Sequence, residues 1–287
     1  MYLPIDKNLV KSTVKKRPAD SEKTTVGSLL SICGSYGMAG AAIMSSKAAL
    51  RSGIGLLKIA TAKSIYPIIA QAVPEAVFYP IDDKFISDFD FIEKSKYCGA
   101  VLAGCGLSVN NNTRELVNNI IKFSEIPIIL DADALNIVSE NPSVLTENDI
   151  VKILTPHDRE FSRLIGKDIS EVKNNREELA VEFAEKYNVI LVLKGHKTLV
   201  VNPSGEIYYN KELGNAGMAS GGSGDVLAGI IGSLIAQGFE PFKSAASSVY
   251  LHALSGDIAK EKFGEISMLP TDIIDCIPTA FKSLGYS

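Results

Sequence analysis

Short apolar runs alternate with longer segments of helical pattern along most of this 287-residue chain. The runs are four to six residues long and rich in Val, Ile and Leu, which is typical of strands buried on both faces. They are residues 28–33, 56–60, 100–103, 127–130, 151–154 and 189–193. This alternation predicts an α/β fold with three layers, in which a mostly parallel central sheet carries helices on both faces.

Helical patterns fill much of the remaining sequence. They predict helices over residues 38–51, 64–72, 224–237, 241–260 and 271–284. Two further short strands, 198–201 and 206–208, flank the turn sequence Asn202-Pro203-Ser204-Gly205 and predict a hairpin. We expect the basic segment 1–24 to be an N-terminal arm. Because no linker rich in Pro, Gly or Ser divides the rest, residues 25–287 are predicted to form one domain.

Glycine and charged residues follow the carboxyl ends of the predicted strands. The segments are Gly104-Cys105-Gly106, Asp131-Ala132-Asp133, Thr155-Pro156-His157 and Lys194-Gly195. In an open parallel sheet, ligands bind in the crevice at the carboxyl ends of the strands. We therefore expect these segments to converge on one site.

A glycine-rich turn, residues 215–224, runs directly into the apolar helical segment 226–236, with Asp225 at the junction. Glycines let the backbone approach a ligand closely, and a helix start offers unpaired N–H groups and a positive dipole end, an arrangement typical of phosphate binding. A carboxylate there would repel phosphate, so Asp225 is better explained as a base that takes a proton from a bound hydroxyl. The alternative is that Asp225 only caps its helix.

Asp131 and Asp133 come directly after an apolar strand. Two carboxylates at a strand end suit magnesium, directly or through water. The alternative is structural: Asp133 caps the following helix and Asp131 bonds to loop amides.

Two other strand ends carry candidate ligand contacts. The segment Thr155-Pro156-His157 has the composition of a helix N-terminus, with Thr155 as cap and Pro156 in the first turn. His157 nevertheless falls on the expected ligand face, where its ring can stack on a bound heterocycle. The segment 194–198 places a lysine, a glycine and a hydroxyl in order, which suits nucleotide phosphates.

Three further features favour structural roles. His196 is expected to face solvent in its turn, and His252 to pack within an apolar helix. The glycines of residues 34–42 have the wrong spacing for Gly-x-Gly-x-x-Gly, which argues against a Rossmann fold. The small side chains of that segment can instead leave room for a large substrate to bind against it.

Composition excludes several classes of function. The chain is 46% hydrophobic and 22% charged, as in soluble globular enzymes. A net charge of −4 gives no reason to expect nucleic acid or an anionic membrane as partner. The four cysteines are scattered, so neither a zinc site nor a disulfide framework is indicated, and a reducing cytoplasm is expected. Residues 1–25 lack the apolar region of a signal peptide, and 226–236 is too short to span a bilayer.

Taken in order, these segments resemble the ribokinase-like NAD(P)H-hydrate dehydratases, which repair hydrated reduced nicotinamide cofactors. The resemblance covers nearly all of residues 25–280. It rests on the segments 34–42, 47–53, 104–107, 130–136, 155–157, 194–198, 214–229 and 250–253. The chain looks like the stand-alone form, without the epimerase domain that many bacterial members carry. The resemblance therefore implies that a separate epimerase acts upstream.

The resemblance implies a ribokinase-like fold and a two-step reaction. A phosphoryl group passes from ADP, or less favourably ATP, to the ring hydroxyl of S-form NADHX or NADPHX, and phosphate is then eliminated. Asp225 would be the base, and the backbone of Gly222, Ser223 and Gly224 would bind the transferring phosphoryl group. The residues that would hold the hydrated dinucleotide are Ala41, Ala42, Gly106, His157 and Asp225. Those that would hold AMP or ADP are Lys194, Gly195, His196, Lys197, Thr198 and Gly224.

The resemblance also implies Mg²⁺, with Asp131 and Glu160 as candidate ligands, and a homotetramer. Two positions depart from the family pattern. Ser223 stands where threonine is usual, and Asp158-Arg159 replaces a common Pro-Gly. Two other functions remain open: a kinase of the same fold acting on a thiazole, a pyrimidine alcohol or a sugar, and a nucleotide-sensing protein without catalysis.

Overall fold

A ten-stranded sheet runs through the part of the chain that the computed structural model describes, residues 2–23, 25–84 and 86–286. The strands are β1 Tyr2–Pro4, β2 Ser28–Ile32, β3 Leu56–Ala62, β4 Val77–Ile81, β5 Ala100–Ala103, β6 Ile128–Leu130, β7 Lys152–Leu154, β8 Ile190–Leu193, β9 Leu199–Val201 and β10 Ile207–Tyr209. Their order is β1-β10-β9-β8-β7-β6-β5-β2-β3-β4. Strand β9 is antiparallel to both its neighbours and every other pair is parallel, which confirms the prediction of a mostly parallel sheet and of the β9–β10 hairpin.

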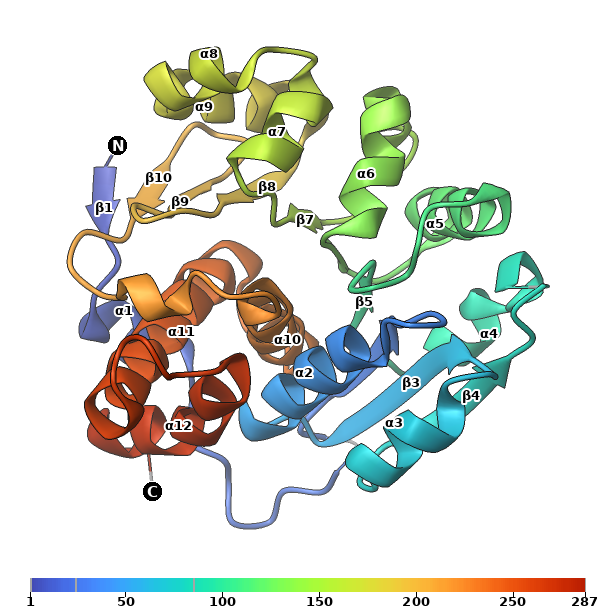
Figure 1. Cartoon of the computed structure of the whole chain (residues 1–287), viewed down its shortest axis with the longest axis horizontal. Helices are drawn as coiled ribbons and strands as arrows, with labels where there is room; N and C mark the ends of the chain where they lie inside the picture. The colour runs from blue at the N-terminus through green and yellow to red at the C-terminus, as the bar shows by residue number, and fades with distance from the viewer. Residues whose placement is uncertain (1, 24, 85, 287) are drawn as a thin grey trace.

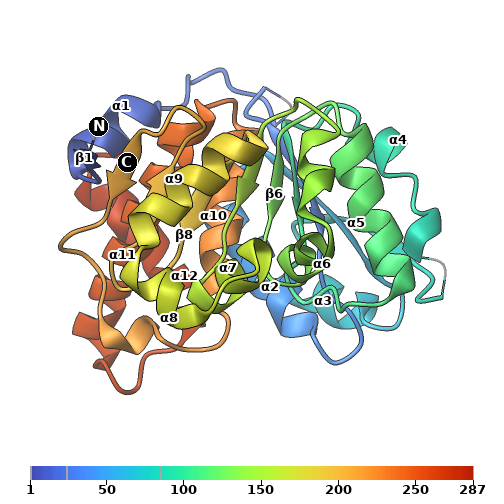
Figure 2. The ribbon, with the colours of Figure 1, turned by 90° about the horizontal axis from the view of Figure 1, so that it is seen from above.

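Helices cover both faces of this sheet, giving the three layers that the sequence predicts (Figure 1). They are α1 Lys7–Thr13, α2 Ala39–Arg51, α3 Tyr66–Ala72, α4 Phe91–Ser95, α5 Asn111–Phe123, α6 Asp133–Glu140, α7 Asp158–Ile165, α8 Ile169–Asn174, α9 Arg176–Tyr187, α10 Ser223–Ala236, α11 Pro241–Phe263 and α12 Pro270–Ser283. Helices α5, α6, α7 and α9 form one layer (Figure 2), and α2, α3, α10 and α11 form the other.

The alternation of side chains along each central strand divides the core in two. Val101 of β5 packs under α5 and its neighbours, whereas Leu102 packs under α2 and α10. Both are fully buried, because a parallel strand between two helical layers has no solvent face. This explains why the strands read as continuous apolar runs.

Small residues set the spacing of α2 and α10. A Cβ at Gly229 of α10 would overlap the carbonyl oxygen of Ser45 in α2. Only glycine allows the two helix backbones to come this close. The contact holds the first turn of α10, and with it Asp225, against the end of the sheet.

Residues 2–13 add to the sheet and to the helical layer, where the sequence pattern predicts only an arm. Strand β1 pairs with β10, and Leu9 and Val10 of α1 are buried. Tyr286 near the other terminus donates a hydrogen bond to the carbonyl of Val10. The apolar residues of this segment form only short groups, so their burial is not evident from the sequence. Met1 and Thr24 of the expected arm lie outside the described residues.

No helix in the described ranges is long and apolar enough to cross a membrane.

Candidate active site

Loops at the carboxyl ends of β5, β6 and β8 meet at the first turn of α10. Gly104 has a φ of +119°, and a Cβ there would overlap the carbonyl oxygen of Asp131. Glycine is therefore needed for the β5 and β6 loops to lie in contact. This contact brings Cys105 and Asp131 together and confirms that polar strand ends converge.

Asp131 is the most buried charged group of the site, with 1% of its surface exposed. Its Oδ1 lies 2.7 Å from Nζ of Lys194 and accepts a hydrogen bond of 2.6 Å from the Thr155 hydroxyl. Burial alone would raise the pKa of Asp131, but the Lys194 ammonium outweighs it and holds the pKa below its usual value. Asp131 is therefore ionised and paired.

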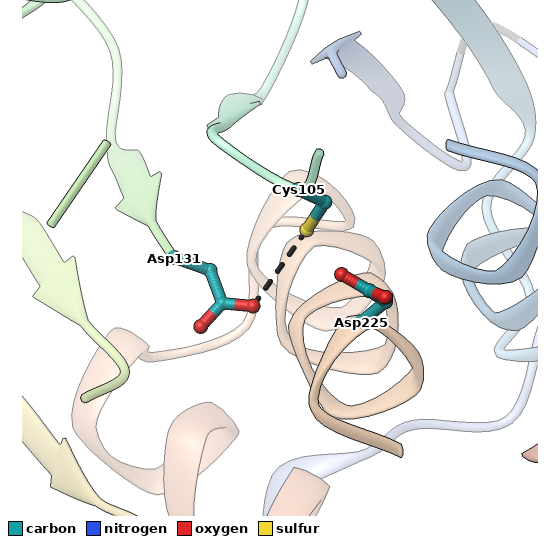
Figure 3. A group of neighbouring side chains, drawn as sticks. All are labelled: Cys105, Asp131 and Asp225. Atoms are coloured by element: carbon teal, nitrogen blue, oxygen red, sulfur yellow. Dashed lines mark hydrogen bonds between the residues drawn. The ribbon is translucent and has the colours of Figure 1, made fainter. Parts of the chain in front are cut away.

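Asp225, the third residue of α10, points toward the same cluster (Figure 3). Cys105, Asp131 and Asp225 each contribute one atom that could bind a metal, and these three atoms lie within 4.8 Å of one another. Burial, followed by the negative charge of Asp131, raises the pKa of Asp225 to about 6. A carboxylate with that pKa is a far better proton acceptor than an ordinary aspartate, and it is still ionised at neutral pH.

The capping alternative for Asp225 does not hold. The N-cap of α10 is Gly222, with φ of +105°, and no side chain caps the helix. Asp225 lies inside the helix, with its carboxylate turned toward Asp131. Asp133 does not cap α6 either, because the N-cap of that helix is Ala132 and no side chain caps it. Its role is nevertheless structural, since its Oδ2 accepts a hydrogen bond of 2.8 Å from the backbone N–H of Ser108.

The glycine-rich turn leaves part of the helix start free. Within the described residues, the backbone N–H groups of Gly224 and Asp225 have no protein acceptor, as expected for a first helical turn. Lys194 lies beside them, since a Cβ at Gly224 would be 3.2 Å from its Nζ. Ser223 differs from the expectation: its amide donates to the carbonyl of Ser220 at 3.2 Å. An anion at this point would therefore meet two free amides and one ammonium.

Helix α11 holds both ends of the glycine-rich turn. The Asp257 carboxylate accepts hydrogen bonds from the amide of Gly214 and the side chain of Asn215, at 2.9 and 3.0 Å. Nε2 of His252 lies 3.2 Å from the Ser223 hydroxyl. Burial lowers the pKa of His252 to about 4, so the ring is neutral. The sequence favours a packing role for His252, and the structure adds a hydrogen-bond partner in the turn.

His157 and Glu160 form the capping box of α7. The amide of Glu160 donates to Nδ1 of His157 at 3.1 Å, and the amide of His157 donates to Glu160 Oε2 at 2.8 Å. The prediction that Thr155 caps this helix is wrong, because Pro156 precedes the helix and the Thr155 hydroxyl is bonded to Asp131. Burial raises the pKa of Glu160, whose Oε2 lies 4.0 Å from Lys194 Nζ.

The turn 194–198 is organised by Arg176, which the sequence analysis missed. Its guanidinium donates to the carbonyl oxygens of Lys194 and Lys197, both at 3.0 Å, and pairs with Asp158 at 2.9 Å. Asp158 is the first residue of the Asp158-Arg159 pair that replaces the common Pro-Gly of the family. Its ion pair with Arg176 gives this replacement a structural role. Nothing in the sequence links residues 158, 176 and 197, because they belong to three different elements.

The other predicted contacts of the turn divide in two. Gly195, His196 and Lys197 are exposed, as expected for His196, whereas Thr198 is buried and its hydroxyl donates to the carbonyl of Gly195 at 3.0 Å. Lys197 also lines a groove of about 650 Å³ between α9 and the edge strands, which is separate from the carboxylate cluster and lined by several glutamates.

The small residues of α2 form a wall beside the cluster. A Cβ at Gly106 would lie 2.8 Å from the Cβ of Ala41, so these two predicted substrate contacts are neighbours. Ala41 is partly exposed, but the Ala42 side chain is fully buried beneath Gly34. A ligand can therefore reach Ala41 and not the Ala42 methyl group.

Comparison with known proteins fits this geometry. The family model for NAD(P)H-hydrate dehydratase matches residues 29–279. The ADP-dependent (S)-NAD(P)H-hydrate dehydratase of Neisseria meningitidis is 38% identical over 87% of this chain and 83% of its own length. The crystal structure of ADP/ATP-dependent NAD(P)H-hydrate dehydratase from Bacillus subtilis, obtained with ATP and Mg²⁺, superposes with a TM-score of 0.85 at 30% identity, covering 97% of each chain.

The chain spans about half the length of other curated relatives. One is the bifunctional NAD(P)H-hydrate repair enzyme of Moorella thermoacetica, which is 33% identical over 96% of this chain and 53% of its own length. The family model and the Neisseria meningitidis relative each match most of this chain. The chain belongs to the NAD(P)H-hydrate dehydratase family, within the ribokinase-like fold.

Proposed function

We propose that this protein dehydrates the S form of hydrated NADH and NADPH, with ADP as phosphoryl donor and ATP as the less favoured alternative. The observation that carries the proposal is Asp225, a carboxylate with a pKa of about 6 at a helix start that has two free amides and the Lys194 ammonium. A base beside an anion site is what phosphoryl transfer to a hydroxyl requires. Membership of the NAD(P)H-hydrate dehydratase family supports the ring hydroxyl of hydrated NAD(P)H as the phosphoryl acceptor.

Asp225 takes the proton of the ring hydroxyl as the oxygen–phosphorus bond forms and the donor's bridging bond breaks, releasing AMP from ADP. The amides of Gly222, Gly224 and Asp225 and the Lys194 ammonium stabilise negative charge on the transferring group. One such donor contributes roughly 100- to 1000-fold in rate. The ring carbon–oxygen bond then breaks with phosphate as leaving group, and loss of a proton from the adjacent carbon restores the double bond.

The remaining predicted contacts have separate tasks in this proposal. His157, Gly106 and Ala41 border the space for the hydrated dinucleotide, with Ala42 only supporting the wall from inside. The turn 194–198, fixed by Arg176, borders the space for the adenine nucleotide. Ser223 contributes through its hydroxyl contact with His252, which fixes the end of the turn.

Mg²⁺ fits the acidic residues of the site. Asp131 and Glu160 already flank a cation, the Lys194 ammonium, at 2.7 and 4.0 Å, and carboxylate oxygens are the ligands that Mg²⁺ prefers. When bound, Mg²⁺ would offset negative charge on the phosphates. We further propose a cytoplasmic homotetramer, supplied with the S epimer by a separate epimerase.

The test is the return of reduced-nicotinamide absorbance from chemically hydrated NADH, with Mg²⁺ and either ADP or ATP. We expect recovery that requires a nucleotide and is faster with ADP. Asp225→Asn should lose 100- to 10,000-fold in rate, roughly the range for a general base, while still binding ADP in a calorimetric titration. Folded protein that binds ADP but restores no NADH with either donor would overturn the proposal and favour a small-alcohol kinase.

A further inference from the structure

A thiol takes part in the cluster that contains the proposed base. Cys105 follows β5, Asp131 follows β6 and Asp225 lies in α10, and all three side chains point toward one another (Figure 3). The Cys105 thiol is fully buried and donates to Oδ2 of Asp131 at 3.7 Å. The phosphoryl-transfer proposal gives this thiol no task.

The separation of Cys105 and Asp131 is close to that of two ligands on one metal ion, and Asp225 lies near both. Zinc binds sulfur at about 2.3 Å and carboxylate oxygen at about 2.0 Å, so a tetrahedral ion holds the two ligand atoms roughly 3.5 Å apart. Cys105 Sγ and Asp131 Oδ2 are 3.7 Å apart, and one atom from each of the three residues lies within 4.8 Å of the others. The distance between Cys105 Sγ and Asp131 Oδ2 therefore exceeds the ligand–ligand distance at tetrahedral zinc by only a few tenths of an ångström.

The ion pair of Asp131 leaves the needed oxygen available. Lys194 and the Thr155 hydroxyl both bind Oδ1, whereas Oδ2 faces Cys105. A divalent ion held by two carboxylates and a thiolate leaves one negative charge, which the adjacent Lys194 ammonium balances. The ammonium, which also lies 4.0 Å from Oε2 of Glu160, thus offsets the charge of the occupied site.

Ligand chemistry separates this site from the magnesium site. Mg²⁺ is bound by oxygen, and a thiol is a poor ligand for it. A sulfur ligand selects zinc and its heavier congener cadmium. On binding, the S–H bond of Cys105 breaks, a metal–sulfur bond forms and the proton passes to water.

We propose that Cys105, Asp131 and Asp225 form a binding site for a thiophilic divalent cation of the zinc class, and that occupancy blocks turnover by occupying the carboxylate of Asp225. The binding stands on the geometry of the three residues alone. The inhibition also rests on the proposed function, because it requires Asp225 to be the base.

Cadmium provides a test that does not depend on activity. Reduced, nucleotide-free protein titrated with Cd²⁺ should develop the ultraviolet thiolate-to-cadmium charge-transfer band at one equivalent. Cys105→Ser and Cys105→Ala should both lack the band, and Asp225→Asn should bind Cd²⁺ at least tenfold more weakly. Cys98→Ser, a buried thiol outside the cluster, is the matched control and should keep the band. Circular dichroism verifies that each variant is folded.

Zinc inhibition is measured separately in the NADH-recovery assay. We expect Zn²⁺ to inhibit the unaltered protein reversibly, with a chelator restoring the rate, and Cys105→Ser to need at least tenfold more Zn²⁺ for half-inhibition of its own uninhibited rate. A wild-type protein without the cadmium band, or a band that persists in both Cys105 variants, would overturn the site. A band without inhibition would overturn the link to Asp225. If the protein restores no NADH at all, the proposed function fails while the cadmium result still decides the site.

Discussion

The pH dependence of the reaction follows from the raised pKa of Asp225. Burial and the charge of Asp131 raise that pKa to about 6, and a base works only in its ionised form. kcat/KM should therefore fall as the pH drops through 6. At pH 5 about one tenth of the carboxylates are ionised, so the rate should be about one tenth of its plateau. An aspartate with the usual pKa of about 3.9 would keep nearly its full rate at that pH.

Replacing Asp131 with Asn tests whether the charge of Asp131 contributes to the raised pKa of Asp225. A like charge within about 4–6 Å moves a pKa by roughly 1–3 units, and here part of the rise comes from burial, which the change leaves in place. Removing the charge also frees Lys194, whose positive charge lowers the pKa of Asp225. Both effects act in the same direction, so the acid limb should move by about one pH unit toward lower pH.

The assay is the initial rate of NADH recovery at limiting hydrate, measured from pH 5 to pH 8 over times too short for acid decay of the product. The measured quantity is the pH at which kcat/KM falls to half its plateau, because Asp131→Asn will also lower the plateau itself. Glu261→Gln, which changes an exposed carboxylate outside the cluster, is the control and should leave the limb near 6. An unaltered protein with a flat profile down to pH 5, or a limb that stays at the same pH in Asp131→Asn, would refute the reasoning.

Three further substitutions test other parts of the argument. Since the folded pKa of Asp225 lies above its unfolded value, the ionised form costs stability above pH 6, and that cost disappears as the pH falls toward 4. Asp225→Asn should therefore raise the free energy of unfolding at pH 7 by up to about 3 kcal/mol in urea titrations, and lower stability there would contradict this. Gly229→Ala should lower the free energy of unfolding by about 3 kcal/mol, because its methyl group would overlap the carbonyl of Ser45, whereas Gly221→Ala, with open space around it, should change little. Arg176→Ala should raise the KM for ADP roughly tenfold with a smaller effect on kcat, because three carbonyl groups in or next to the turn 194–198 lose their hydrogen-bond donor. An unchanged KM would show that the turn takes no part in nucleotide binding.

The sheet could be predicted because its strands obey a local rule. Strands buried on both faces must be apolar throughout, so β2, β5, β6, β7 and β8 are visible as short runs. Strand β4 is different: its residues are partly exposed, and Pro80 lies within it. Strand β1 has only three residues and pairs with a strand some 200 residues away. Neither leaves a periodic pattern in the sequence.

Within the site, the sequence indicated the neighbourhood but not the pairings. Residues at the carboxyl ends of parallel strands had to converge, which placed Cys105, Asp131 and Lys194 in one region. That Lys194 would pair with Asp131, and that the Ser223 hydroxyl would meet His252, depends on side-chain directions set by packing. The contribution of Arg176 depends on three elements that only the fold brings together.

The Lys194–Asp131 pair predicts how nucleotide and magnesium depend on each other. In the proposed reaction Lys194 binds the phosphates, yet in this structure its Nζ is bound to Asp131 at 2.7 Å, and Asp131 is buried. Moving Lys194 away would leave the Asp131 charge unpaired, which is costly unless another cation compensates it. ADP should therefore bind at least tenfold more tightly with Mg²⁺ than without it. In Asp131→Asn no charge is left behind, so ADP binding without Mg²⁺ should strengthen and its dependence on Mg²⁺ should shrink. Calorimetric titrations of both proteins, with and without Mg²⁺, measure these four affinities, and an equal Mg²⁺ dependence in the two proteins would show that Asp131 does not compete with the phosphates for Lys194.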